Sequence, residues 1–322
     1  MQKSHPRFED GEILISGYEA PSARFALVAV RRGCKNSVTM NPSRSQNSNY
    51  PVVTFTSLSM TSQLNALYSG KVSRAGALLP DTHALLRNWN LDQSADENYR
   101  RCEEENWLAK PSRLRVRHVL MPLKQRYRQC DEQIRALVFL KQHNLPAATL
   151  DWILFFHTLQ ADNLLRDLTL RVLLPLHDMG KNSVRKEDVE MMLFEWTAQG
   201  LTGEQWSAVT IRKIATSSLA VFRQFRVLSA DTPAKFQIPH LPLAAFAYLA
   251  FWLQKEQPSG ERLLSHPAWQ WFFLNPETVE HLFIEAHNHR LLEYYVAGSV
   301  IRLDFPANNL EEYARVIARS TS

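Results

Sequence analysis

The 322-residue chain holds 45% hydrophobic residues and eight Trp, enough apolar surface to build a core, so its composition excludes global disorder. It has only ten Gly and lacks both the glycine-rich phosphate-binding loops and the G-x-S-x-G nucleophile elbow, so it carries no nucleotide-binding or hydrolase signature. The net charge is +5, but residues 1–50 hold seven Lys or Arg against four acids, which leaves +2 for the rest; a nucleic-acid argument must therefore rest on local clusters.

Residues 1–52 have the composition of a low-complexity or loosely ordered leader. They show no sustained periodicity and end in NPSRSQNSNY, a Ser- and Asn-rich stretch typical of linkers. The first residues, MQKSHPRFEDGEI, contain acids and no apolar run, which argues against a secretory signal. The three cysteines are odd in number and widely spaced (Cys34, Cys102 and Cys130), which favours reduced thiols in a cytoplasmic protein over a disulfide framework or a zinc site.

Residues 53–130 are expected to form a helix-turn-helix-like DNA-binding domain. A first helix is predicted at about 78–89. Ser94, followed three residues later by Glu97, forms a capping box that predicts a second helix ending near Trp107. The turn LAKPS follows, and its Ser112 is the N-cap of a third helix. Two capped helices separated by such a short turn have the spacing of a helix-turn-helix.

Residues 131–245 are expected to form a helical domain that ends in a winged-helix-like ribbon. Apolar stripes predict helices at 134–140, 150–159, 164–176 and 184–196, and Gly200 closes the last of them. A capping box at 202–205 predicts a further helix from about Gln205 to Phe225. Extended pieces on both sides of a turn at 229–233 then predict a small β-ribbon.

Residues 246–322 are expected to form a C-terminal helix-hairpin-helix unit. The apolar run LPLAAFAYLAFWL, Leu241 to Leu253, falls short of the roughly 20 residues that a membrane-spanning helix needs, so it predicts a buried helix. Segments 291–296 and 300–305 predict a hairpin, and Asn309 with Glu312 caps a final helix. The predicted fold class is mainly α, multi-helical, with helix-turn-helix or winged-helix-like parts and small β-hairpins.

The segment SRLRVRHVLMPLKQRYR, residues 112–128, carries six Lys or Arg and no acid. At about 100° per residue, one arc of a helix here is apolar and a ridge of bases lies beside it. The ridge consists of Arg113, Arg117, Lys124 and Arg128, and Arg115 and Arg126 flank the other edge of the apolar arc. Such a helix can bury one stripe and present bases to several phosphates.

Two observations favour a plainer interpretation of this segment. Surface helices are often rich in Arg, and the acids Glu103 to Glu105 just before it would neutralise the cluster. Pro122 also stands in mid-segment, where it should kink the helix or end it near Met121. From the residues alone, a phosphate-binding ridge and an ordinary solvated face both stay open.

A second candidate is the predicted helix from Gln205 to Arg226. Arg212, Thr216, Arg223 and Arg226 share a face about 120° from its apolar stripe. With the ribbon after it, this helix has a winged-helix layout, although helix-then-hairpin is a common arrangement and only four bases are involved.

The remaining clusters do not predict chemistry. His281, His287 and His289 stand among glutamates at the i,i+4 spacing of ordinary surface pairs, and no zinc motif is present. Pro80-Asp81 resembles the start of a nuclease motif but lacks the acid-x-Lys partner that a metal nuclease needs. The sequence therefore predicts a protein without catalytic residues, metal or cofactor.

Diffuse features spread over about residues 55–245 resemble the BrxA family, accessory proteins of bacterial BREX phage-defence systems. They are the early Gly76 to Leu79 (GALL), Glu105 to Leu108 (ENWL) followed by Ser112 and the Arg-rich segment with Arg126-Tyr127, the aromatic middle with Trp152, Phe155 and Phe156, Trp206-x3-Thr210-x2-Lys213, and the closing Arg226 to Leu228 (RVL) with Ile238-Pro239.

The resemblance implies a helical core, double-stranded DNA binding without catalysis, and work beside a methyltransferase, an alkaline-phosphatase-like protein and a large ATPase. By that analogy the Arg-rich segment contacts DNA. The leader and the C-terminal unit depart from the family pattern. The alternative is a protein–protein scaffold in the same complex that does not touch DNA. The candidate DNA-binding residues are Lys110, Ser112, Arg113, Arg115, Arg117, Lys124, Arg126, Arg128, Arg212, Lys213 and Arg223.

Overall fold

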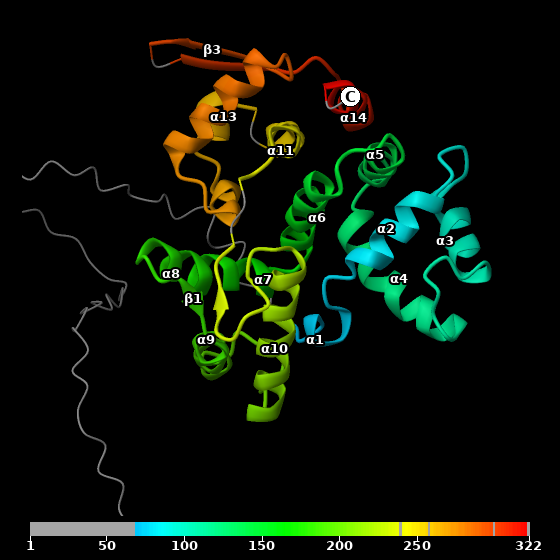
Figure 1. The fold of residues 1–322 in the computed structure, drawn as a ribbon, viewed down its shortest axis with the longest axis vertical. Coiled ribbons are helices and arrows are strands. Elements are labelled where there is room, and N and C mark those ends of the chain that lie inside the picture. Colours follow the sequence, from blue (N-terminus) through cyan, green and yellow to red (C-terminus); the bar gives the residue numbers. More distant parts are fainter. Residues whose placement is uncertain (1–67, 238–239, 257, 299, 321–322) are drawn as a thin grey trace, which may run out of the picture. The chain divides into compact units, whose positions relative to one another are not determined.

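The computed structural model describes residues 68–237, 240–256, 258–298 and 300–320, all within the second of the two units into which the chain divides, Thr56–Ser322. The predicted leader therefore lies outside the described residues. The described part is mainly helical with two small antiparallel β-sheets, which confirms the predicted fold class (Figure 1). The helix-turn-helix and winged-helix comparisons, and the internal domain boundaries, stay predictions.

The first half of the described chain is a run of helices. The first four are α1 (Val72–Ala75), α2 (Leu79–Asn88), α3 (Ala95–Glu104) and α4 (Arg113–Tyr127). They are followed by α5 (Asp131–Gln142), α6 (Ala147–Ala161), α7 (Asn163–Leu168), the π-helical turn η1 (Thr169–Leu173) and α8 (Leu174–Asp178).

The second half carries the short strands. Its elements are β1 (Ser183–Val184), α9 (Lys186–Ala198), α10 (Ala208–Gln224), β2 (Ala234–Lys235), α11 (Leu243–Glu256), α12 (Gly260–Leu264), the 3-10 helix η2 (Pro267–Phe272), α13 (Pro276–Asn288), β3 (Glu293–Ala297), β4 (Val300–Asp304) and α14 (Leu310–Ser320).

The centre of the core is α6, which is apolar around almost its whole circumference and is buried accordingly. α11 packs on it and is nearly as buried, which confirms the helix expected at 241–253. The two are joined by a buried hydrogen bond of 3.0 Å between Nε2 of His157 and the hydroxyl of Tyr248. A polar pair in so apolar a place must be satisfied internally, so it fixes how α11 sits on α6.

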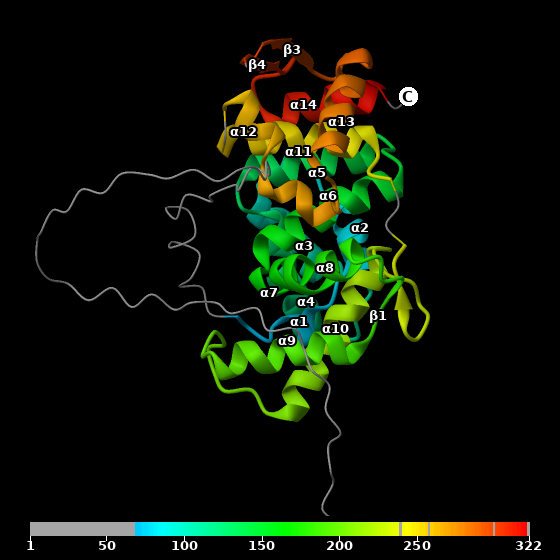
Figure 2. The same ribbon diagram turned by 90° about the vertical axis from the view of Figure 1, so that its left-hand side faces the viewer.

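The last helix returns to the first half of the chain. In both views α14 lies beside α5 and α11 (Figures 1 and 2). Glu132 of α5 joins the three helices, because its carboxylate accepts from the backbone N–H of Leu310 at the start of α14 and from Nζ of Lys255 on α11. Arg135 of α5 also donates to Glu311 of α14 at 2.8 Å.

Three of the predicted N-caps are confirmed: Ser94 accepts from the backbone N–H of Glu97, Ser112 from that of Arg115 and Asn309 from that of Glu312. The capping box expected at 202–205 does not form. The hairpin of β3 and β4 also has the expected position.

Several details of the predicted helices are wrong. α3 ends at Glu104 rather than near Trp107. α10 begins at Ala208, because Ser207 caps it while the hydroxyl of Thr202 donates to the carbonyl of Glu204 in the preceding turn. Segment 164–176 is not one regular α-helix: Pro175 has no N–H, and the ladder widens just before it into the π-turn, where Leu174 N–H donates to Thr169.

The two arms of the ribbon expected after α10 pair with each other as predicted. The backbone N–H of Ser229 donates to the carbonyl of Lys235 and that of Gln237 to the carbonyl of Val227, on the two sides of the bridge between Leu228 and Phe236. The strand β2 also pairs with β1, about fifty residues earlier in the chain, which the sequence did not predict. Val184, expected to start a helix, belongs to β1, and α9 starts at Lys186. No helix among the described residues has the length and apolarity to cross a membrane.

Candidate nucleic-acid interface

Helix α4 carries most of the candidate residues and is a single helix from Arg113 to Tyr127. Val116, Leu120, Leu123 and Tyr127 are buried, as the predicted apolar arc requires. Pro122 lies within the helix and does not end it, so the prediction that it could split the segment is wrong. The helix tolerates Pro122 because buried side chains on both sides of the proline anchor it, and the price is one missing hydrogen bond to the carbonyl of His118.

The predicted ridge faces α3, whose acids occupy part of it. Nε of Arg117 donates to Oε1 of Glu103 at 2.6 Å, and Nη1 of Arg128 donates to Oδ1 of Asp96 at 2.6 Å. Between them, Nζ of Lys124 lies 4.2 Å from the centre of the Tyr99 ring. These hydrogen bonds lower the pKa of Glu103 and of Asp96, so both acids stay ionised at neutral pH.

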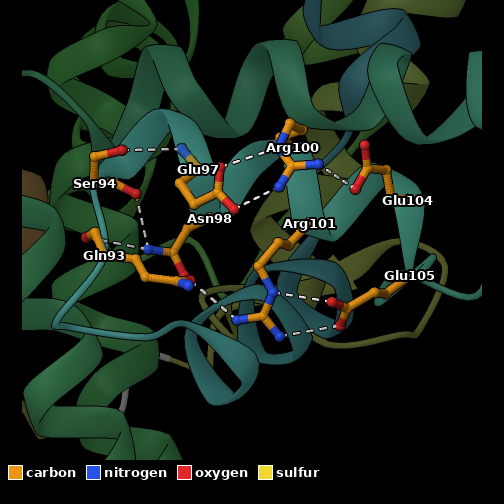
Figure 3. Close-up of polar contacts among 8 residues, drawn as sticks. All are labelled: Gln93, Ser94, Glu97, Asn98, Arg100, Arg101, Glu104 and Glu105. Atoms are coloured by element: carbon orange, nitrogen blue, oxygen red, sulfur yellow. Dashed lines mark hydrogen bonds and ion pairs between the residues drawn. The ribbon is translucent and has the colours of Figure 1, made fainter.

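The other acids of α3 do not reach α4 (Figure 3). Arg100 bridges Glu97 and Glu104, with N–O distances of 2.6 Å to each. Arg101 donates to Glu105 at 2.9 Å. The acidic run 103–105 therefore does not neutralise the basic segment as a block: Glu103 pairs with α4, and its two neighbours pair within α3 (Figure 3).

Arg126 is not at the surface. Its side chain is buried at 3% exposure and donates to the backbone carbonyls of Gly76 (2.8 Å) and Ala77 (3.1 Å). These carbonyls lie just before α2, in a segment where Gly76 and Leu78 have positive φ. Arg126 therefore fixes the connection between α1 and α2; it also forms part of the wall of a pocket beside α4, but both of its terminal nitrogens already donate to backbone carbonyls.

The opposite edge of α4 is open. Arg115 and His118 are exposed and line a pocket of about 810 Å³ with Lys71, just before α1, and with Gln125. One acid, Asp162, also lines this pocket, but it accepts from the backbone N–H of Leu165 as the N-cap of α7, and burial raises its pKa. The pocket therefore gathers more cations than anions.

The start of α4 is unusually positive. Its first turn contains Arg113 and Arg115 and no acid. Because the N-terminal end of a helix dipole is itself positive, acids are the favoured residues there. Among the described residues, neither arginine forms an ion pair. The N-terminal end of α4 thus presents positive charge to solvent from two guanidinium groups and from the helix dipole.

The remaining candidates divide into structural and exposed residues. Nζ of Lys110 is held by Asp81 at 2.6 Å, and Ser112 is occupied as the cap of α4. On α10, Arg223 donates to the carbonyls of Ser229 and Asp231 and so holds the loop before β2. Arg212 and Lys213 are exposed on the same helix.

Sequence reasoning missed Lys71 and His118. His118 stands within the basic segment but was not among the candidate residues, because only the fold shows which edge of α4 is open. Lys71 carried no signal at all, because α1 reaches the pocket through long-range packing, including contact with α10. No group of three or more His, Cys, Asp or Glu within the described residues is arranged to hold a metal ion.

Comparison with known proteins places the chain by its sequence. The profile of the protein family described as BrxA matches residues 66–251, more than half of the chain. No curated protein matches it. The matched region includes α4 and α10, the helices that carry most of the candidate DNA-binding residues.

Proposed function

Because the chain belongs to the BrxA family, components of bacterial BREX phage-defence systems, we propose that it binds double-stranded DNA in such a system without catalysing a reaction. The contact is made by the first turn of α4 and by the open edge of this helix. Arg113 and Arg115 bind phosphates at the start of the helix, and Lys71 and His118 extend the contact across the adjoining pocket.

One observation carries this proposal: the first turn of α4 holds no acid and two arginines that form no ion pair within the described part of the chain. Like charges placed at the positive end of a helix dipole destabilise the isolated helix. An anion bound there removes that penalty, and DNA supplies a row of anions. Contacts of this kind position the protein on the duplex without reading its sequence, and they need no cofactor.

The binding surface differs from the ridge first expected. Arg126 is left out because its donors are satisfied by backbone carbonyls, and Lys110 because it is held by Asp81. Arg212 and Lys213 on α10 remain a second candidate contact, since both are exposed. The methyltransferase, the phosphatase-like protein and the ATPase of such systems are proposed partners.

A scaffold role is the second candidate function, and exposed apolar side chains favour it. Leu114 and Met121 on α4 are 61% and 68% exposed, and Met191 and Phe194 project from α9. Side chains of this kind often mark protein contacts. In that case α4 would bind a protein surface, and the affinity for a duplex would be weak at every salt concentration.

The test is binding of a short labelled duplex by the double variant Arg113→Ala/Arg115→Ala over a range of salt concentrations. Each phosphate contact contributes close to one unit to the salt slope, so the slope should fall by about two and the affinity by about tenfold or more at low salt. The matched control is Arg262→Ala/Arg290→Ala, which removes the same charge from exposed positions on the C-terminal side.

Three outcomes would count against the assignment. Equal weakening by both double variants would mean that only overall charge matters. Loss of binding in Arg212→Ala/Lys213→Ala but not in the α4 variant would move the contact to α10. Absence of duplex binding by the unaltered chain at low salt would leave the scaffold role.

A further inference from the structure

Two carboxylates of α3 lie where DNA phosphates would lie if the duplex engaged the ridge of α4. We propose that Glu103 and Asp96 are built-in competitors of phosphate: they hold Arg117 and Arg128 in the free protein and are displaced when a duplex binds. The ridge is then a second contact surface, and Glu103 and Asp96 set how much of it DNA can use. This inference rests on the proposed function, because it concerns the same helix.

The geometry of the Arg117–Glu103 pair is that of a guanidinium meeting an anion. Nε and Nη2 of Arg117 both point to one oxygen of Glu103, at 2.6 and 2.5 Å. A phosphate oxygen is an acceptor of the same kind and geometry, so it would use the same donors. Since the donors cannot serve two anions at full strength, phosphate and carboxylate compete.

The pair is placed so that competition is feasible. The side chain of Arg117 is 63% exposed, so a ligand can approach it from solvent. Exposed ion pairs are weak because water competes for both charges, and a row of phosphates can therefore displace them. Arg128 is less exposed and has Asp131 as a further partner at 3.6 Å, so Arg117 should be released more easily.

The helices do not need these pairs to stay together. Tyr99 and Cys102 of α3 are buried against the core, and the ring of Tyr99 meets that of Trp89 edge-on. Apolar burial of this extent outweighs a surface ion pair. The acids that face α4 are thus free to serve binding rather than stability.

The ion pairs of α3 make it possible to compare two adjacent glutamates, Glu103 and Glu104, of which one holds a base of the ridge and the other does not. Glu104 contacts Arg100, which Glu97 also holds, so loss of Glu104 releases no base (Figure 3). Loss of Glu103 releases Arg117. Two adjacent glutamates with the same charge therefore differ only in whether a base of the ridge becomes available.

The experiment compares Glu103→Gln with Glu104→Gln in full-length protein, using a short labelled duplex at several salt concentrations. Both variants gain affinity from the lost negative charge. Glu103→Gln should gain about two- to fivefold more than Glu104→Gln, the range expected from release of one exposed ion pair, and its salt slope should become steeper by about one unit. Thermal melting verifies that both variants fold as the unaltered chain does.

A double variant identifies the released base. Arg117→Ala alone should change affinity little, because the phosphate contact that it removes is offset by the Arg117–Glu103 pair that binding no longer has to break. Glu103→Gln/Arg117→Ala, in contrast, should lose the extra gain of Glu103→Gln. Equal gains in Glu103→Gln and Glu104→Gln, or a gain that survives Arg117→Ala, overturn the inference while duplex binding itself stands. If no variant binds a duplex even at low salt, the proposed function fails and the inference falls with it.

Discussion

Arg115 and Arg126 lie on the same edge of α4, about three turns apart, yet they have opposite environments. Arg115 is exposed at the mouth of a pocket, and Arg126 is buried against the backbone before α2. The difference comes from what each end of the helix meets: α2 and its connection cover the C-terminal half of this edge. Residue type and helical angle are equal for the two, so a helical wheel cannot separate them.

This contrast gives a matched pair of substitutions. Arg126→Met should lower the free energy of unfolding by about 2–4 kcal/mol, because the carbonyls of Gly76 and Ala77 lose their donors inside the protein. Arg115→Met should change it by less than about 0.5 kcal/mol, as surface substitutions usually do. Chemical denaturation measures both.

Duplex binding should show the reverse order. Arg115→Met weakens it, and the folded fraction of Arg126→Met binds like the unaltered chain. A variant at Arg126 that kept full stability but lost DNA binding would show that this guanidinium leaves its carbonyls to meet phosphate.

At the scale of helices and strands, the sequence predicted what depends on neighbours along the chain. The caps at Ser94, Ser112 and Asn309 and the β3–β4 hairpin rest on residues a few positions apart, and all are confirmed. The pairing of β1 with β2 could not be foreseen, since each is two residues long and carries no pattern of its own. Pro122 was misjudged because propensity favours a break, while buried neighbours on both sides hold the helix.

The candidate site could likewise be predicted only in the features that depend on nearby residues of the chain. Helical periodicity located the apolar arc and the bases of α4 correctly. It could not show that α3 lies along the ridge, so that Glu103 would meet Arg117 while Glu104 and Glu105 would not. Which acid of three adjacent ones reaches a neighbouring helix depends on the angle and rotation of both helices, and single-sequence patterns do not contain these.

The junction of α6 and α11 makes stability depend on pH. Burial lowers the pKa of His157 from 6.5 to about 3, so the imidazole stays neutral in the fold where the unfolded chain would protonate it. Between these two values the unfolded state binds more protons. The free energy of unfolding should therefore fall as pH falls below about 6.5, by about 1.4 kcal/mol per unit at most from this group.

Denaturation at a series of pH values tests this prediction with His157→Gln, which should flatten the dependence between about pH 6 and 4. His281→Gln is the control, because His281 is exposed on α13 and the pH dependence should persist in its absence. An unchanged slope in His157→Gln would assign the acid sensitivity to other groups, among them His266, whose pKa burial also lowers.

At the scale of the whole described chain, the C-terminal helix completes a core that begins in the first half. α14 covers α5, and Glu132 and Arg135 of α5 bind groups of α14. The BrxA match ends at residue 251, before α14 begins. The matched region therefore does not include all the residues that cover its hydrophobic core, because α14 covers α5 from outside it.

A chain that stops after Glu256 should consequently fail to fold cooperatively, although it keeps all of α11 and the whole matched region. Loss of α14 exposes the apolar face of α5 and leaves Arg135 without Glu311. The measurement is thermal melting followed by circular dichroism, together with limited proteolysis. A sharp transition and a protease-resistant core in the shortened chain would show that residues 246–322 form a separate domain.

The return of α14 to α5 also has a consequence for synthesis on the ribosome. The hydrogen bond between Arg135 and Glu311 joins positions 176 residues apart, whereas the Arg117–Glu103 pair spans 14. The α3–α4 pair can assemble while the chain is still being translated, but the face of α5 stays uncovered until α14 has been synthesised. Nascent chains of this protein should therefore expose the apolar face of α5 to chaperones until α14 has left the ribosome.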